Sequence, residues 1–347
     1  MLQTHIALDH YNTLKVHCTA KYFLEIGSTY QLLQAIETPE WKQEKKRILG
    51  GGANTLFVSD FFDGLVVKIG IKGFKILAED EQSLVLQVGA GEKWQDLVDY
   101  CVAHQLGGIE NMTDIPGNVG TSAVSNIGAY GQEVSSVIEE VIGLNLQTKT
   151  LQKLSNADCA FAYRESVFKH DLEGEFIITH ISFRLKKIDQ NYSFATAYAD
   201  VQAAFAEQEI AFEELSPSEK LQTLVTTISE IRASKLPNLE QTGTAGSFFK
   251  NPEISLPQRE QLHQRFPQLK AHLTSQELMK LSAGQLIELC GWKGKTLNNV
   301  KMSEQHALIL INKSKAGKDV LHYAEQVQAA VYEQFGIELE PEVRYCQ

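Results

Sequence analysis

Hydrophobic residues recur along this chain with two periods, which predicts a mixture of strands and helices. Helical spacing of apolar residues marks 30–41, a stretch beginning at Trp94, and a long run from Leu221 to Ile231 that ends at the breaker Pro237. One face of the helix beginning at Trp94 carries Trp94, Leu97, Val98, Cys101 and Val102. Short runs of apolar or alternating residues, typical of strands, occupy 47–49, 64–69, 74–79, 83–90, 137–146 and 175–185.

The chain beyond about residue 225 has its own pattern. Helical spacing returns at 258–266, 282–290 and 318–335, and the apolar run 307–312 predicts one strong strand. The chain closes on a strand-like stretch at 337–346. We therefore place a domain boundary near 225, followed by a compact α+β lobe of about 100 residues.

Composition narrows the class of protein. The 347 residues are 43% apolar and 22% charged, as in ordinary globular proteins, and the formal net charge is −11. An acidic surface repels phosphate backbones, so we expect neither nucleic acid nor membrane as a partner. The five cysteines never form a C-x-x-C pair, no metal-ligand spacing is present, and the N-terminus lacks signal-peptide features. These features predict a cytoplasmic protein with reduced thiols.

Two glycine motifs resemble phosphate-binding loops and fail on inspection. Gly89-Ala90-Gly91 follows a strand and precedes a helix, but Trp94 occupies the third glycine position of a dinucleotide fingerprint. Gly294-Lys295-Thr296 resembles the end of a phosphate loop, but Leu289 stands where that motif needs its first glycine. We interpret the second motif as a turn.

Two other glycine-rich segments remain as candidates. Gly50-Gly51-Gly52-Ala53-Asn54 follows a buried strand and could point successive backbone N–H groups at a diphosphate, although a simple glycine turn is the alternative. The segment 107–131 is too long and too rich in glycine to be an ordinary connector. Together they could hold one extended nucleotide cofactor between them.

Several longer motifs carry a resemblance to a known family. They are GGGANTLF (50–57), IPGNVGTSAVSNIGAYG (115–131), YRESVFK (163–169), GTAGSFFKNP (243–252) and LEPEVR (339–344). In this order, over nearly the whole chain, they resemble the UDP-N-acetylenolpyruvoylglucosamine reductases, flavoenzymes of bacterial peptidoglycan precursor synthesis. The resemblance extends to the longer subtype, which keeps a tyrosine loop over the substrate.

The resemblance implies an α+β fold with an FAD-binding part in two subdomains, of the vanillyl-alcohol-oxidase type, and a substrate-binding domain. The limits expected are 1–70 and 71–225 for the FAD-binding subdomains and 226–347 for the substrate-binding domain. The last strand, about 337–347, is a candidate to return to the FAD-binding part. Non-covalent FAD, NADPH as reductant, the enolpyruvyl sugar nucleotide as substrate, and a monomer or weak oligomer are the corresponding expectations.

The implied reaction is the reduction of an enol-ether double bond, which builds up negative charge that must be stabilised and then protonated. The resemblance assigns these tasks to three residues. Arg164 can bind the substrate carboxylate through its guanidinium fork, Glu342 can hold an enol proton or orient the arginine, and Ser247 can deliver the proton to carbon.

The other implied contacts are to the two ligands. Cofactor-binding candidates are Gly50, Gly51, Gly52, Ala53, Asn54, Thr55, Pro116, Gly117, Gly120, Thr121, Ser122, Asn126, Gly128 and Ala129. Substrate-binding candidates are Tyr163, Tyr198, Lys235, Asn251 and His306, of which His306 could equally be a core histidine. Ala53 and Ser125 depart from the family pattern, which has serine and glutamine there, and they affect only the expected FAD contacts.

Two other functions stay open at this point. A flavin oxidase or dehydrogenase of the same superfamily would keep the glycine loops and change the substrate. A flavin or sugar-nucleotide binding protein would keep the loops without needing Ser247, Arg164 and Glu342.

Overall fold

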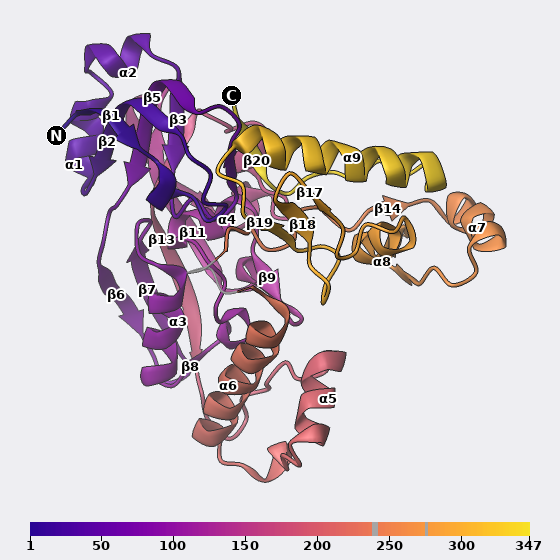
Figure 1. The fold of residues 1–347 in the computed structure, drawn as a ribbon. Coiled ribbons are helices and arrows are strands. Elements are labelled where there is room, and N and C mark those ends of the chain that lie inside the picture. The colour runs from indigo at the N-terminus through magenta and orange to yellow at the C-terminus, as the bar shows by residue number, and fades with distance from the viewer. Residues whose placement is uncertain (238–241, 275–276) are drawn as a thin grey trace. The chain divides into compact units, whose positions relative to one another are not determined.

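In the computed structural model, which describes residues 1–237, 242–274 and 277–347, the chain forms two compact units. The first unit comprises Met1–Thr4, Tyr22–Gly51 and Asp63–Ser234. The second comprises His5–Lys21, Gly52–Phe62 and Lys235–Gln347. Three strands, β1 (Gln3–Ala7), β2 (Thr19–Ile26) and β5 (Phe61–Ile69), contain residues of both units. Helices and strands are mixed in both units, which confirms the expected α+β class (Figure 1).

The first unit is built around a large antiparallel sheet with strand order β12-β11-β13-β7-β6 and β8 paired to β13. The strands are β6 (Phe74–Glu79), β7 (Ser83–Gly89), β8 (Leu106–Gly107), β11 (Ile138–Asn145), β12 (Thr150–Ser155) and β13 (Phe176–Lys187). Both β7 and β13 are mostly buried because they lie in the interior of the sheet. Smaller elements are β3 (Lys46–Leu49), parallel to β5, and the pair β9 (Gly128–Ala129) and β10 (Gln132–Glu133).

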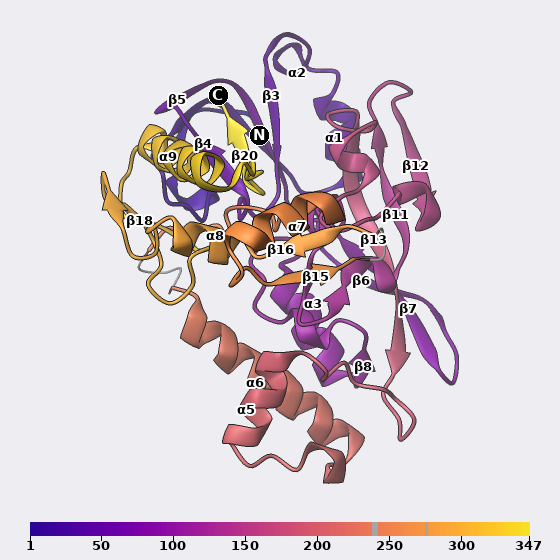
Figure 2. The ribbon, with the colours of Figure 1, turned by 90° about the vertical axis from the view of Figure 1, so that its right-hand side faces the viewer.

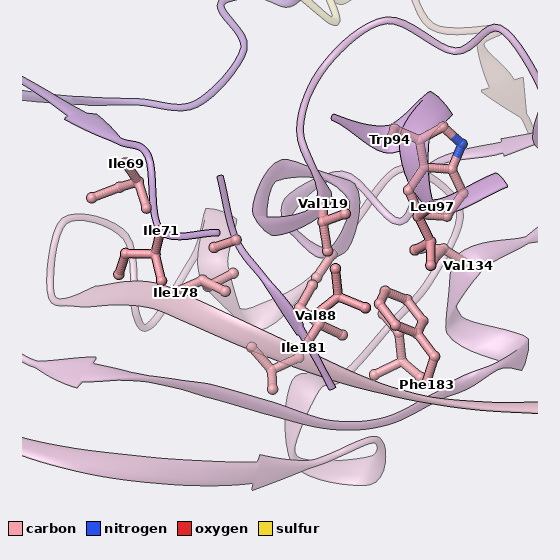
Figure 3. Packing of buried hydrophobic residues seen from close by; sticks show 14 of the residues in the cluster. Ile69, Ile71, Val88, Trp94, Leu97, Val119, Val134, Ile178, Ile181 and Phe183 are labelled. Carbon is pink, nitrogen blue, oxygen red and sulfur yellow. The ribbon is translucent and has the colours of Figure 1, made fainter. Parts of the chain in front are cut away.

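The first unit contains six helices in its described residues, of which α3 and α4 contact this sheet. The six are α1 (Thr29–Ala35), α2 (Pro39–Gln43), α3 (Trp94–Ala103), α4 (Val119–Val124), α5 (Ala199–Glu207) and α6 (Pro217–Lys235), the last ending one residue into the second unit. Figure 3 shows Trp94 and Leu97 of α3 and Val119 of α4 packed with Phe183 of β13. Their burial removes large apolar surfaces from water and fixes α4 beside the sheet.

A separate small core lies under α5 and α6. Its buried members are Val201, Phe205, Phe212, Leu224 and Ile228, and Tyr130 and Phe194 pack against it. This cluster therefore connects the two helices with the glycine-rich loop that contains Tyr130.

The second unit combines short strands with three helices in its described residues (Figure 2). Its strands are β4 (Thr55–Phe57), β14 (Glu253–Ile254), β15 (Ala271–Leu273), β16 (Met279–Leu281), β17 (Thr296–Leu297), β18 (Val300–Met302), β19 (Leu310–Asn312) and β20 (Arg344–Cys346). Its helices are α7 (Leu256–Arg265), α8 (Ala283–Leu289) and α9 (Gly317–Phe335). Tyr323 of α9 is fully buried, and its hydroxyl accepts from Met302 N and donates to Lys295 O.

Single turns of 3-10 helix connect several of these elements. They are Asp9–Tyr11, Glu110–Met112, Val134–Ser136, Ala157–Cys159, Val167–Lys169 and Phe212–Glu214. The turn Glu110–Met112 is fully buried, although two of its three residues are polar. No helix in the described part of the chain is long and apolar enough to cross a membrane.

Candidate active site

The two glycine-rich segments touch each other within the first unit. A Cβ added to Gly50 would lie 2.4 Å from Thr121 Cγ2, and one added to Gly51 would lie 2.7 Å from Gly117 Cα. Side chains at these positions would push the segments apart, because real Cβ atoms do not approach other atoms so closely. The fold therefore brings together the two segments that were expected to hold one cofactor.

Asn118 fixes the second segment at the start of α4. It is the N-cap of this helix in a capping box with Thr121, and its Nδ2 donates to Gly91 O at 2.8 Å. Gly120, two residues later, packs closely on Ala90, because a Cβ added to Gly120 would lie only 2.6 Å from Ala90 Cβ. Asn118 was absent from the sequence-based candidates, although an asparagine just before a short apolar run is a helix-start signal.

The glycines of the rejected dinucleotide motif have a packing role. Added Cβ atoms on Gly89 and Gly91 would lie 2.4 Å from Ile71 O and from Gly70 C, respectively. Both glycines thus permit close contact between backbone segments. Gly294, of the rejected phosphate-loop motif, has a φ of +71° in the turn before β17, as that interpretation required.

The remainder of the first glycine loop belongs to the second unit. Gly52 has a φ of +66°, and an added Cβ would lie 1.9 Å from Tyr11 O, so only glycine fits. The backbone N–H groups of Gly52, Ala53 and Asn54 donate no hydrogen bond to any described residue. Successive unpaired N–H groups form a concave donor surface for an anion, which fits the diphosphate of FAD.

The remaining cofactor candidates lie on the same elements. Ser122, inside α4, donates to Val119 O at 2.6 Å, and Gly128 and Ala129 form β9. Thr55 begins β4, and Pro116 directly precedes Gly117.

Asn126 organises the turn around the cofactor candidates. It is fully buried, and its Nδ2 donates to Glu133 Oε2 at 2.9 Å and to Ala162 O at 3.0 Å. Its Oδ1 accepts from Ser135 N at 3.1 Å. The Asn126 side chain therefore connects the end of the second glycine-rich segment to Glu133 and Ser135 and to the segment that carries Arg164.

Arg164 itself is held against this loop. Its Nη1 donates to Asn126 O at 3.2 Å and its Nη2 to Gly128 O at 2.9 Å, while Lys169 Nζ donates to the Arg164 carbonyl at 2.7 Å. The guanidinium carbon lies 5.2 Å from the ring centroid of Tyr163, within range of a cation–π contact. The planar fork is thereby oriented by carbonyls of the predicted FAD loop.

Ser247 and Glu342 lie on adjacent backbone segments of the second unit. Glu342 N donates to Phe248 O at 2.9 Å, and the segment containing Ser247 also pairs on its other side, as a bridge from Ser247 to Ile309. Both side chains are half-buried, whereas Phe248 and Phe249 are fully buried and anchor the segment. Glu342 is thus hydrogen-bonded to Phe248, and Ser247 is the residue that precedes Phe248 in the neighbouring segment.

Asn54 connects the glycine loop to the same place. Its Nδ2 donates to Glu342 O at 2.8 Å, and Arg344 N donates to Asn54 O at 3.1 Å. Within the second unit, the fold thus brings together Asn54, Ser247 and Glu342. Arg164 belongs to the first unit.

Tyr198 and its neighbours form an aromatic and cationic cluster in the first unit. Tyr198 is the N-cap residue of α5, is 47% exposed, and contacts the Tyr130 ring edge-to-face at a centroid distance of 5.2 Å. Burial raises the pKa of Tyr130, whose hydroxyl is hydrogen-bonded to Arg232. Arg232 Nη2 donates to Asp114 O at 3.1 Å. Tyr130 and Arg232 were missed from the sequence, because an ordinary helix residue and a loop tyrosine carry no signal that they meet.

The remaining substrate candidates lie in the second unit. Asn251 Oδ1 accepts from Ala283 N at 3.0 Å and so caps the start of α8. His306 is half-buried, and its Nδ1 accepts from Leu308 N at 3.3 Å in the turn before β19. Lys235 is the last residue of α6.

Two family models match the chain. Residues 237–346 match the C-terminal domain of UDP-N-acetylenolpyruvoylglucosamine reductase, and residues 20–150 match an FAD binding domain.

Similar proteins cover almost the full length. A UDP-N-acetylenolpyruvoylglucosamine reductase of Flavobacterium johnsoniae is 39% identical over 99% of this chain and 98% of its own. A protein of the same name from Amoebophilus asiaticus is 38% identical over 100% of this chain and 99% of its own. Among solved structures, the reductase from Thermus caldophilus aligns with a TM-score of 0.69 at 21% identity over 100% of both chains, which supports the fold.

Proposed function

Because the chain belongs to the UDP-N-acetylenolpyruvoylglucosamine reductase family, we propose that Ser247, Arg164 and Glu342 carry its proton and charge chemistry. The protein is an NADPH-dependent FAD oxidoreductase that converts UDP-N-acetylenolpyruvoylglucosamine to UDP-N-acetylmuramate in bacterial peptidoglycan precursor synthesis. FAD, when bound, supplies the hydride-transfer chemistry between the nicotinamide and the enolpyruvyl double bond.

The glycine-rich segments are proposed to hold FAD. In the first unit Gly50 and Gly51 lie directly on the segment of Gly117 and Thr121, and in the second unit Gly52, Ala53 and Asn54 present backbone N–H groups. Backbone donors of this kind bind a diphosphate without needing a lysine or arginine.

Arg164 is proposed to stabilise the charge that develops on the substrate carboxylate. Support comes from the two backbone carbonyls that orient its guanidinium, at 3.2 and 2.9 Å. A donor that is fixed before the reaction stabilises developing charge without reorganising.

Ser247 is proposed to protonate the carbon next to the carboxylate, with Glu342 holding an enol proton or orienting the arginine. The observation that carries this proposal is the backbone pairing of the two segments, through the 2.9 Å bond from Glu342 N to Phe248 O. A serine hydroxyl is a weak acid, so it can protonate only a strongly basic carbanion-like centre, which is what hydride addition to this substrate produces.

Tyr198 is proposed to cover the substrate diphosphate, with Lys235 and Asn251 binding phosphate and nucleotide. Tyr163 and His306 complete the proposed set. The 47% exposure of Tyr198 supports this role, because a side chain that covers a ligand must be reachable by it.

One anaerobic experiment tests the function. The purified protein is expected to be yellow, to lose flavin absorbance on addition of NADPH, and to regain it when the enolpyruvyl sugar nucleotide is added. Recovery only with oxygen, or bleaching of the oxidised flavin by a small alcohol in place of NADPH, would instead identify a flavin oxidase or dehydrogenase. Bound flavin that NADPH never reduces would identify a binding protein.

The setting of the enzyme is a further part of the proposal. A cytoplasmic location is supported by its reductant and substrate, which are charged nucleotides that do not cross membranes unaided. A monomer or weak oligomer is proposed, and sedimentation at several protein concentrations tests it.

A further inference from the structure

We propose that Glu110 and Asn111 are positioning residues that fasten the tyrosine loop to the glycine-rich segment and thereby place Tyr198. The tyrosine loop is residues 188–198, between the end of β13 and the start of α5. This inference rests on the proposed role of Tyr198 over the substrate. All of the residues concerned lie in the first unit.

Glu110 is a buried carboxylate with three donors. It is 1% exposed, and its Oε2 accepts from Gly108 N at 2.6 Å. Its Oε1 accepts from Gln132 Nε2 at 2.9 Å and from the Tyr192 hydroxyl at 2.7 Å. A buried carboxylate is stable only when it is well bonded, so these partners are held in place together. Of these, Gln132 directly follows the glycine-rich segment 107–131, and Tyr192 belongs to the tyrosine loop.

Asn111 makes a second link between the same two segments. It is 0% exposed, and its Nδ2 donates to Tyr130 O at 2.8 Å and to Ala195 O at 2.7 Å. Its backbone N donates to Gln132 Oε1 at 2.9 Å. Its own Oδ1 is buried with no partner among the described residues. The side chain therefore contributes through its two donations, at the cost of one unsatisfied acceptor.

Both links converge on Tyr198. The Tyr130 carbonyl is fixed by Asn111, and the Tyr130 ring contacts the Tyr198 ring edge-to-face at 5.2 Å. On the loop side, Tyr192 contacts Phe194 at a centroid distance of 4.8 Å, and Phe194 contacts Phe212 of the small core at 5.8 Å. The tyrosine loop is thus attached at Tyr192 and Ala195, shortly before Tyr198.

The test is the Tyr192→Phe substitution, which keeps the ring and removes only the hydrogen bond to Glu110. Because a hydrogen bond to a carboxylate stabilises the placed loop, its loss should weaken substrate binding. We expect the KM for the enolpyruvyl sugar nucleotide to rise by about fivefold or more. The kcat is expected to stay within about twofold, because ground-state placement of the loop is affected and the proton transfer is not.

A double-mutant cycle assigns the effect to Tyr198. In a Tyr198→Ala background, Tyr192→Phe is expected to change KM by less than about twofold, because the residue through which it acts is gone. If Tyr198→Ala alone leaves KM unchanged, the proposed role of Tyr198 is wrong. If Tyr198→Ala raises KM and the Tyr192→Phe effect is absent or simply additive, this inference is wrong and the proposed function stands.

A matched control is available in Tyr323→Phe, which removes a buried, hydrogen-bonded hydroxyl in the second unit. It is expected to lower the melting temperature without changing KM or coupling to Tyr198. An equal KM increase in this control would show that a general loss of stability is responsible.

Asn111→Ala removes the hydrogen bonds from Asn111 Nδ2 to Tyr130 O and Ala195 O and is expected to raise KM further than Tyr192→Phe does. Retained FAD would show that this variant has folded. A KM equal to wild type in folded Asn111→Ala would contradict the inference.

Discussion

Arg164 is constrained in both its backbone and its side chain. Its φ is +57°, a left-handed conformation that is uncommon for residues other than glycine and asparagine. Asn126, to whose carbonyl the guanidinium donates, also has a positive φ of +40°. Such conformations persist where the surrounding bonds over-determine them, and they concentrate at functional sites. This observation is independent of the motif that first singled out Arg164.

Arg164→Lys tests whether the guanidinium fork matters. A lysine carries the same charge but cannot donate to Asn126 O and Gly128 O with a rigid planar group. Steady-state kinetics should show a loss of about 10² in kcat, as for removal of an oriented oxyanion donor. Arg184→Lys, on an exposed pair with Glu139, is the matched control and should be near wild type. Near-normal turnover of Arg164→Lys would show that charge alone suffices.

Ser247→Ala separates the two halves of the reaction. We expect reduction of the sugar nucleotide to slow by about 10² to 10⁴, as when a general acid is removed, with NADPH bleaching of the flavin unchanged. Stopped-flow absorbance measures each half separately. Ser255→Ala, which removes the N-cap hydroxyl of α7 in the same unit, should cost stability but not rate. Turnover of Ser247→Ala within a few-fold of wild type would exclude the proton-donor role.

Sequence reasoning reached Arg164, Ser247 and Glu342 through motifs, and their roles stay predictions. It did not reach Glu110 or Asn111. A buried glutamate and asparagine look like ordinary surface residues in a sequence, and only the folded chain shows that Tyr192 and Ala195 supply their partners.

At the scale of elements, hydrophobic periodicity predicted several helices and strands but not always their limits. The helix beginning at Trp94 is found as α3, with its apolar face buried. The strand expected over 307–312 is shorter, because only Leu310–Asn312 pairs with β18, while Ile309 bridges to Ser247. The helix expected over 30–41 is divided into α1 and α2, because Thr38 caps a new helix that has Pro39 at its start. That proline was visible in the sequence.

Gly51→Ala tests the contact between the glycine-rich segments. The new Cβ would lie within 2.7 Å of Gly117 Cα, which is backbone and cannot rotate away. We expect about 1–3 kcal/mol of lost stability and reduced FAD content, by overpacking. Gly27→Ala is the control, because its nearest neighbour is the Gln31 side chain at 3.4 Å. Thermal unfolding and the ratio of flavin to protein absorbance measure both effects, and full FAD content in Gly51→Ala would contradict the proposed arrangement.

At the scale of the whole molecule, the chain alternates between its units. The second unit takes His5–Lys21 and Gly52–Phe62 in addition to the chain from Lys235 onward. Hydrophobic patterning could not predict this, because short apolar runs do not show which distant run they join. The domain limits at 70 and 225 stay predictions.

Buried cysteine thiols and a buried tyrosine hydroxyl predict that the folded protein loses stability at alkaline pH. Burial raises the pKa of Cys18 and of Cys159 from 9.0 to about 12, and that of Tyr323 from 10.0 to about 12. The unfolded chain therefore loses these protons first as the pH rises. The stability they contribute is complete below pH 9 and is lost progressively towards pH 12. Melting temperatures measured from pH 8 to 11 should fall, and the Cys18→Ala, Cys159→Ala double variant should fall less. A constant melting temperature over that range would contradict the assignment.

The pairing of β20 with β4 has a consequence for synthesis on the ribosome. Thr55–Phe57 pairs in parallel with Arg344–Cys346, and Val58 N donates to Cys346 O at 2.9 Å. The nascent chain can therefore complete the pairing of Thr55–Phe57 only after Arg344–Cys346, far downstream in the sequence, has left the exit tunnel. Until then the apolar Leu56 and Phe57, both fully buried in the finished fold, are available to chaperones.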